Sequence, residues 1–326
     1  MFKALVLEQE DRKTLTSIRQ IDISDLPEGE VLVKVDYSSL NYKDGLAITG
    51  KGKIIRDFPM VPGIDFAGTV VESASDMLTP GASVILTGWG VGENHWGGMA
   101  EMARVKASQL VVMPEGLDAR KAMAIGTAGI TAMLCVMALE DAGVTPEQGE
   151  ILVTGASGGV GSVSVSLLSK LGYQVAAVSG REQNTELLTA LGAKKVLPRS
   201  QFSEQGRPMD RQLWAGAIDT VGSQLLANVI SQINYGGAVA ACGLAGGFDL
   251  PTTVMPFILR NVSLLGVDSV MCPQQRRTMA WQRLAELLPE EFYQQATQEV
   301  SLEEVPELAE AITKGQVTGR VLIKIS

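Results

Sequence analysis

Residues 151–161 read ILVTGASGGVG, an apolar run that enters a glycine-rich turn, and no other part of the chain is as informative. The segment after it, Ser162 to Lys170, has the apolar spacing of a helix. A strand, a glycine turn and a helix form a phosphate-binding unit, because a pyrophosphate needs backbone N–H groups at close range. Gly158, Gly159 and Gly161 keep that approach open and let the helix pack close to the strand.

The next apolar run bears on the choice of nucleotide. Tyr173 to Val178 predicts a buried parallel strand, and Ser179-Gly180-Arg181 follows where the ribose of a dinucleotide should lie. An NAD site usually carries Asp or Glu there, whereas an arginine fork can bond two oxygens of the 2′-phosphate of NADP. The sequence therefore predicts NADPH. Arg199, after the short run Lys195 to Leu197, is either a second cation for that phosphate or a solvated loop charge.

Composition narrows the class of protein further. A chain of 326 residues predicts two domains, and 46% hydrophobic residues with 35 glycines suit a compact α/β protein. The net charge of −9 argues against sequence-independent binding of nucleic acid. Cys135, Cys242 and Cys272 are widely separated, which indicates a reducing compartment, and we expect the cytoplasm.

One segment has nearly the length of a membrane span. Ala122 to Leu139 holds 18 residues without a charge, but Gly126, Thr127, Gly129 and Thr131 weaken a membrane interpretation. A buried helix that joins two domains is favoured, and we expect no membrane partner. The N-terminal apolar patch is too short for a signal peptide.

The pattern of the chain changes near residue 125. Before it, short candidate strands alternate with turns: Phe2 to Leu7, Val31 to Tyr37, Phe66 to Glu72, and Ser83 to Leu86. After it, further strands follow the first two: Lys195 to Leu197, Gly216 to Asp219, Gly237 to Ala241, and Val262 to Val267. Helical segments separate them, including Thr185 to Gly192 and Ser223 to Ile233. This alternation predicts a doubly wound parallel sheet.

The remaining segments complete this organisation. Gln274 to Leu288 is expected to be helical, and Arg320 to Ile325 is expected to be a strand that rejoins the first domain. Ligands of doubly wound sheets bind at the carboxyl ends of the strands. Four residues near such ends are therefore either cofactor contacts or ordinary turn residues: Val221, Gly222, Leu244 and Ala245.

These parts, in this order, resemble the medium-chain dehydrogenase/reductase superfamily over essentially the whole chain. The motifs that carry the resemblance are Asn41-Tyr42-Lys43-Asp44, residues 62–68 (PGIDFAG), residues 155–161 (GASGGVG) and residues 319–323 (GRVLI). The resemblance implies an α/β fold class with a GroES-like, mostly-β domain plus a Rossmann doubly wound parallel sheet. The expected ranges are 1–124 for the catalytic domain, 125–265 for the NADPH-binding domain, and 266–326 for the return to the catalytic domain.

The chain departs from the zinc alcohol dehydrogenases of that superfamily. Gly63-Ile64-Asp65 replaces their Gly-His-Glu triplet, and their structural-zinc cysteine cluster is missing. His95 is the only histidine, whereas a catalytic zinc needs about three His, Cys or carboxylate ligands. The chain is similar instead to the zinc-free quinone-oxidoreductase branch, and we expect no metal.

Four longer segments of the chain resemble the family of NADPH-dependent acrylyl-CoA reductases. They are residues 38–44 (SSLNYKD), 49–56 (TGKGKIIR), 87–98 (TGWGVGENHWGG) and 251–260 (PTTVMPFILR). The resemblance implies reduction of acryloyl-CoA to propanoyl-CoA, by hydride transfer to the β-carbon and protonation of the α-carbon. It also implies a homodimer formed through the Rossmann domain. The NADPH contacts that it implies are Tyr42, Ser157, Gly158, Gly159, Val160, Gly161, Ser179, Gly180, Arg181, Arg199, Leu244, Ile258 and Ser269.

Tyr42 is the first candidate for a catalytic residue. The reaction needs a donor at the thioester oxygen, where negative charge grows, and the phenol could donate there or lie against the nicotinamide. The alternative is a packed aromatic residue. Asn41 and Asp44 are expected to fix the loop by bonds to its backbone, in preference to direct chemistry. Lys43 faces the substrate phosphates or is solvated.

Other polar residues leave alternatives open. His95 lies in a glycine-rich loop beside Trp89 and Trp96, where a structural hydrogen bond is favoured over a role as an acid. Lys51, Lys53 and Arg56 form a basic cluster that either attracts the phosphates of coenzyme A or is a solvated loop.

Two further functions remain open from the sequence. An NADPH:quinone or enone oxidoreductase would share the fold and the cofactor. A non-catalytic NADPH-binding protein would share both and turn nothing over. The leading hypothesis is an NADPH-dependent reductase of a short 2-enoyl-CoA.

Overall fold

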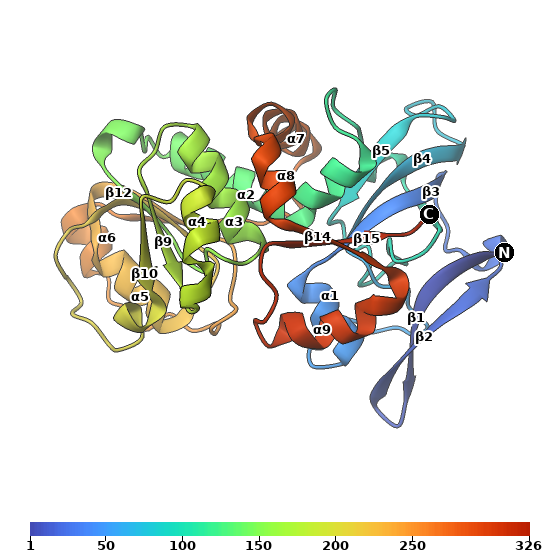
Figure 1. The fold of residues 1–326 in the computed structure, drawn as a ribbon, viewed down its shortest axis with the longest axis horizontal. Helices are drawn as coiled ribbons and strands as arrows, with labels where there is room; N and C mark the ends of the chain where they lie inside the picture. Colours follow the sequence, from blue (N-terminus) through green and yellow to red (C-terminus); the bar gives the residue numbers. More distant parts are fainter. The chain divides into compact units, whose positions relative to one another are not determined.

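The computed structural model describes residues 1–326, which divide into two compact units (Figure 1). Unit 1 comprises Met1–Thr127, Ser269–Glu286 and Thr297–Ser326, and unit 2 comprises Ala128–Asp268 and Leu287–Ala296. The sequence predicts that residues 266–326 return to the first domain. The contacts instead place Leu287–Ala296, which contains helix α8 (Glu290–Gln295), in unit 2.

Unit 1 is built on a seven-stranded sheet and a separate hairpin. The sheet runs in the order β14-β15-β3-β4-β5-β7, and β6 pairs with β3. Its strands are β3 (Val31–Leu40), β4 (Asp65–Ser73), β5 (Ser83–Thr87), β6 (Met102–Val105), β7 (Leu110–Val112), β14 (Thr297–Ser301) and β15 (Arg320–Lys324). The hairpin is β1 (Phe2–Glu10) with β2 (Lys13–Ile21). The expected mostly-β first domain is confirmed.

The end of the chain completes this sheet. β15 pairs antiparallel with β3, with Val321 opposite Leu40, and parallel with β14 (Figure 1). Val321, Leu322 and Ile323 are fully buried. The prediction that the last apolar segment rejoins the first domain is therefore confirmed.

Unit 2 contains a six-stranded, entirely parallel sheet in the order β10-β9-β8-β11-β12-β13. Its strands are β8 (Ile151–Val153), β9 (Val175–Ser179), β10 (Lys195–Pro198), β11 (Trp214–Asp219), β12 (Ile233–Ala241) and β13 (Ser263–Gly266). The strand order reverses between β8 and β11, which is where ligands bind in such sheets. The predicted Rossmann sheet is confirmed.

The α-helices separate or cover these strands. They are α1 (Tyr42–Thr49), α2 (Ala119–Asp141), α3 (Gly159–Lys170), α4 (Thr185–Ala190), α5 (Ser223–Ser231), α6 (Met255–Arg260), α7 (Gln274–Leu287), α8, and α9 (Val305–Thr313). The helix expected over Ser223 to Ile233 ends earlier, at Ser231, because Ile233 already begins β12.

Helix α2 is the apolar segment that has the length of a membrane span. By length and composition alone it could cross a membrane, but 89% of its most apolar window is buried inside the protein. Its backbone is not helical at Gly126, where φ is +53°, and the helix kinks there. The burial is typical of a core helix, as the sequence analysis expected.

Several strands were missed from the sequence. β2 and β14 are mostly polar and half-exposed, and β6 and β7 have only four and three residues. Short or polar strands give little hydrophobic pattern, so their pairing depends on neighbours that are distant in the sequence.

Candidate functional site

The glycine turn of unit 2 joins β8 to α3. Gly158 stands at the N-cap of α3, and Gly155 has a φ of +56°. A Cβ atom at Gly161 would collide with the carbonyl oxygen of Gly155 and approach the Cα of Ala156 to 2.6 Å. Only glycine allows the helix to pack this closely. The first N–H groups of α3 have no partner within the helix, so they can bind an anion such as a diphosphate.

A buried carboxylate supports this turn at the reversal of strand order. Asp219, at the end of β11, accepts hydrogen bonds from Thr154 Oγ1 at 2.7 Å and from the Gly222 N–H at 2.8 Å. Burial raises the pKa of Asp219, and these hydrogen bonds oppose the rise. The carboxylate therefore ties the ends of β8 and β11 together. No role for Asp219 was predicted, although an acidic residue at the end of a buried apolar strand is a usable signal in the sequence.

A pocket of about 670 Å³ opens at the ends of β9 and β10. It is lined by Ser179, Gly180, Arg181, Glu182, Thr185, Val196, Leu197, Pro198, Arg199, Ser200 and Ser203. A Cβ atom at Gly180 would stand 3.1 Å from Arg199 Cζ, so the Arg199 guanidinium lies against the Gly180 backbone. The structure therefore brings Arg181 and Arg199 to one pocket. Two guanidinium groups beside one carboxylate, Glu182, make that pocket suited to a phosphate.

The other sequence-predicted contacts lie elsewhere. Leu244 follows β12 in the loop beside Gly222, and Ile258 is on α6; both are largely exposed. Ser269 belongs to unit 1, where its carbonyl oxygen accepts a hydrogen bond from Arg277 Nη2 at 3.0 Å. None of these three lines the 670 Å³ pocket. Their roles as cofactor contacts remain predictions.

In unit 1, Tyr42 is the first residue of α1, and 42% of it is exposed. The residues around it are buried. Asp44 accepts the backbone N–H of Asn41 at 2.9 Å with Oδ2, and those of Gly63 and Ile64 at 3.1 and 3.0 Å with Oδ1. The expectation that Asp44 fixes the loop through the backbone is confirmed. A partly exposed phenol thus stands on a firmly held turn.

Asn41 works through its side chain as well as its backbone. Its amide donates to Asp65 Oδ2 at 2.9 Å and accepts from Arg320 Nη1 at 3.3 Å. Arg320 also donates to Ser39 Oγ at 2.8 Å and to the Ala124 carbonyl at 3.0 Å. Asn41, Asp44, Asp65 and Arg320 are all buried, and we call them the charged hub.

Burial and the neighbouring charges shift the pKa values of Asp44 and Arg320. Burial raises the pKa of Asp44 to about 7, the nearby charge of Asp65 adds to the rise, and the backbone hydrogen bonds oppose it. Burial lowers the pKa of Arg320, and the two carboxylates counteract that effect. One guanidinium therefore faces two carboxylates away from water.

The remaining candidates of unit 1 have structural partners. The ring nitrogen His95 Nε2 lies 2.6 Å from the Arg104 carbonyl oxygen, and because a carbonyl only accepts, that nitrogen carries the proton. This favours the structural interpretation of His95. Lys43 forms a 2.6 Å ion pair with Glu93. Both contacts hold the 88–98 loop.

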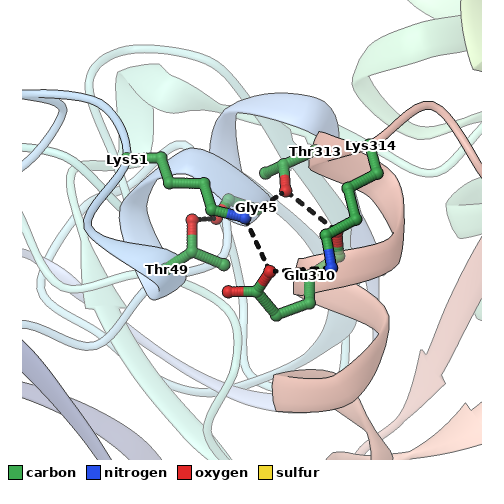
Figure 2. Close-up of polar contacts among 6 residues, drawn as sticks. All are labelled: Gly45, Thr49, Lys51, Glu310, Thr313 and Lys314. Atoms are coloured by element: carbon green, nitrogen blue, oxygen red, sulfur yellow. Dashed lines mark hydrogen bonds and ion pairs between the residues drawn. The ribbon is translucent and has the colours of Figure 1, made fainter.

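The basic cluster is partly neutralised. Lys51 Nζ lies 2.6 Å from Glu310 and 3.1 Å from Thr313 Oγ1 on α9, and Lys314 approaches the same Glu310 at 3.6 Å (Figure 2). Lys53 and Arg56 are exposed. Lys51 therefore has a role in holding α1 to α9, which the sequence analysis did not foresee.

The residues offer no ready metal centre. No group of three or more His, Cys, Asp or Glu side chains is arranged to hold a metal ion. The three cysteines are not bonded to one another as disulfides.

Comparisons with known proteins agree with this architecture. Residues 27–115 match the family model "Alcohol dehydrogenase GroES-like domain", and residues 159–287 match "Zinc-binding dehydrogenase". The GroES-like sheet and the doubly wound sheet with its glycine turn define a two-domain dehydrogenase or reductase. The chain belongs to the medium-chain dehydrogenase/reductase superfamily, and within it to the group of the acrylyl-CoA reductases.

The relatives define this group. The chain is 68% identical to the probable acrylyl-CoA reductase AcuI of Escherichia coli, over 99% of this chain and 100% of that one. It is 52% identical to the acrylyl-CoA reductase AcuI of Ruegeria pomeroyi, over the full length of both. The structure of YhdH from Salmonella enterica in complex with NADP is 65% identical, with a TM-score of 0.98, over 99% of this chain and all of that one.

A more distant relative points to quinones. YhfP of Bacillus subtilis, named provisionally as a quinone oxidoreductase, is 44% identical over 100% of this chain and 99% of its own length. Its structure with NAD bound has a TM-score of 0.96 and covers 99% of both chains. Relatives named for quinone reduction are thus less similar than those named for acrylyl-CoA.

The raised pKa of Asp44 predicts how stability depends on pH. Between about pH 4 and pH 7 the folded chain holds a proton that the unfolded chain has released, so the free energy of unfolding should fall as the pH rises through this range. We expect a contribution on the order of 1–4 kcal/mol. Urea unfolding at several pH values, followed by tryptophan fluorescence, measures it. Asp44→Asn should flatten the profile, and an unchanged slope would contradict the assignment.

Proposed function

We propose that this chain is an NADPH-dependent reductase of the C=C bond of a short 2-enoyl-CoA, with acryloyl-CoA reduced to propanoyl-CoA. The observation that carries the proposal is the pocket lined by both Arg181 and Arg199, in a unit that also carries the glycine turn before α3. It supports a dinucleotide with an additional phosphate. The choice of thioester is supported by the 68% and 52% identity to proteins named acrylyl-CoA reductase.

The residues of unit 2 fit the proposed cofactor. The first N–H groups of α3, which follow the turn Ser157 to Gly161, would hold the diphosphate, because they have no partner within the helix. Ser179, Gly180, Arg181 and Arg199 would hold the 2′-phosphate. When bound, NADPH supplies the hydride that the β-carbon of the substrate receives.

The residues of unit 1 would serve the thioester. Negative charge grows on the thioester oxygen during the reaction, and a hydrogen-bond donor fixed at that oxygen stabilises it. Tyr42 offers a phenol on the first turn of a held helix, and 42% of the residue is exposed. We propose that it donates to this oxygen. The α-carbon of the resulting enolate then takes up a proton.

Two of the basic residues remain candidates for the phosphates of coenzyme A. Lys51 is engaged by Glu310, which leaves Lys53 and Arg56 exposed on the segment after α1. The eight residues of α1 span about 12 Å, and an extended pantetheine arm is longer than that. We propose that Lys53 and Arg56 attract the nucleotide end of the substrate.

Substrate preference distinguishes a 2-enoyl-CoA reductase from a quinone reductase and from a non-catalytic protein. An enone or quinone reductase would turn over a small quinone with NADPH as well as it turns over acryloyl-CoA, and a non-catalytic protein would turn over neither. We expect kcat/KM for acryloyl-CoA to exceed that for a quinone by at least about 100-fold, or roughly 3 kcal/mol. Absorbance at 340 nm with acryloyl-CoA, crotonyl-CoA, acrylate and a quinone measures it. Comparable values for quinone and acryloyl-CoA would reject the proposal.

Cofactor preference depends on the two arginines. Arg181→Ala and Arg199→Ala should each raise the Kd for NADPH, by about 10-fold for a loss of roughly 1.4 kcal/mol, because each removes a charged partner of the 2′-phosphate. The Kd for NADH should stay nearly unchanged. Calorimetry with both nucleotides tests this, with Arg207→Ala as an exposed control in the same unit. Equal losses for both nucleotides would assign the arginines a role other than 2′-phosphate binding.

We also propose a homodimer formed through the Rossmann domain, in the cytoplasm. β13 is the last strand of the sheet of unit 2, so its outer edge is free to pair with a second copy. Exposed apolar side chains of the same unit include Tyr235, Phe248, Leu259 and Leu264. Charge on this edge should oppose pairing.

Light scattering tests the dimer. The wild type should have twice the mass of the 34.6 kDa chain, and Leu264→Lys should shift it toward the single-chain mass. Leu15→Lys, an exposed site in unit 1, is the control and should remain dimeric. A single-chain mass for the wild type would contradict the proposal.

A further inference from the structure

Asp44 connects two segments of unit 1 through three backbone hydrogen bonds. It accepts the N–H of Asn41, which directly precedes Tyr42, and the N–H groups of Gly63 and Ile64, which directly precede β4. The side chain is 1% exposed, so its oxygens face these donors and not a substrate. A carboxylate is well suited to this position, because it only accepts and its charge strengthens each bond.

The charged hub also fixes Asn41, the residue that directly precedes Tyr42. Asn41 uses its side-chain amide for Asp65 and Arg320. Its backbone N–H is bound by Asp44, the third residue of the helix, as in a capping box. Tyr42 therefore lies between two residues that are both held by buried polar contacts.

The far end of α1 is fixed as well. A Cβ atom at Gly45 would stand 3.2 Å from the Ala309 carbonyl oxygen and would crowd Ile312, so α1 packs closely on α9. Thr49 Oγ1 donates to the Gly45 carbonyl, and Lys51 reaches Glu310 and Thr313 on α9 (Figure 2). With the C-terminal end held by α9, a movement of the first turn would have to break the contacts of Asp44, together with those of Asn41 and the Lys43–Glu93 ion pair.

Burying Asp44 is unfavourable for stability. The carboxylate is removed from water and lies near the carboxylate of Asp65, which raises its pKa. A neutral capping residue such as serine would satisfy one N–H group without this cost. The unfavourable charge is understandable if the geometry of the turn matters for more than stability.

We propose that Asp44 is a positioning residue for the reaction: by binding the backbone at Asn41, Gly63 and Ile64, it sets the place of the Tyr42 phenol. The inference rests on the proposed function, in which Tyr42 donates to the thioester oxygen. Asp44 acts through the backbone and does not touch the substrate. Its effect should therefore appear only when the Tyr42 hydroxyl is present.

A double-mutant cycle tests this coupling. Asp44→Asn keeps the shape of the side chain but turns one acceptor into a donor that faces an N–H group. We expect it to lower kcat about 10- to 100-fold, as misplacement of a catalytic group does, and to change the Kd for NADPH by less than about twofold. Tyr42→Phe should lower kcat without weakening NADPH binding. In the Tyr42→Phe background, Asp44→Asn should cost less than about threefold more.

Controls separate positioning from folding. Asp76→Asn removes an exposed carboxylate of unit 1 and should leave kcat unchanged. Near-UV circular dichroism and the Kd for NADPH report whether Asp44→Asn is folded. If it is not, Asp44→Glu, which keeps the charge on a longer side chain, takes its place in the same cycle with the same expected coupling to Tyr42→Phe.

The outcomes distinguish this inference from the proposed function. Losses that multiply in the double variant would overturn the positioning role and leave the reductase activity standing. The same holds if Tyr42→Phe retains full turnover. A wild-type chain that does not reduce acryloyl-CoA would overturn the proposed function, and the inference with it.

Discussion

The organisation of unit 1 depends on the hydrogen bonds of the buried Arg320 guanidinium. Arg320 begins the final strand, β15, and donates to Ser39 Oγ, Asn41 Oδ1 and the Ala124 carbonyl. A buried guanidinium is stable only where oxygens and negative charge surround it, and Asp44 and Asp65 supply that charge. Gly126 must lack a side chain here, because a Cβ atom would stand 2.5 Å from Arg320 Nη2. One charge thus holds together the end of β3, the start of α1, the kink of α2 and the return of the chain.

In unit 2, strand register accounts for the position of Arg199 next to Gly180. β9 and β10 are parallel neighbours, and Ser179 lies opposite Pro198. The residues that follow, Gly180 and Arg199, therefore leave the sheet side by side. The order of strands in a doubly wound sheet was predictable from the alternation of helices and strands. With that order, the placement of Arg199 beside the Ser-Gly-Arg tip could have been inferred from the amino-acid sequence alone. Arg199 is exposed and also lines the pocket, so its role as a second cation for the phosphate stays a prediction beside that of a solvated loop charge.

Local sequence patterns predict some features of this fold and not others. The fold class, the six strands of unit 2 and the return strand follow from periodic apolar residues, which are visible in the sequence. The pairing of Lys51 with Glu310 joins residues separated by 259 positions, and no local pattern marks it. The placement of Leu287–Ala296 in unit 2 likewise depends on packing and not on composition. The bond of His95 to the Arg104 carbonyl depends on how two loop segments meet. Local sequence predicts elements well, but partners that are distant in the sequence are set by the whole fold.

The hydrogen bonds that Asp65 accepts are determined by its place in the charged hub. Where the zinc alcohol dehydrogenases resembled by the sequence carry the histidine of their Gly-His-Glu triplet, this chain has Ile64, whose side chain has no donor atom. Asp65 does have a carboxylate, but it accepts four hydrogen bonds, from the Ser39 N–H, Ser39 Oγ, Asn41 Nδ2 and the Thr127 N–H. A carboxylate has about four lone-pair positions, so these donors fill its capacity. Asp65 is therefore committed to hydrogen bonds within the hub, two to backbone N–H groups and two to side chains. In the proposed reaction the developing negative charge is stabilised by a hydrogen-bond donor, so the position of the Tyr42 phenol depends on the turn that this hub holds.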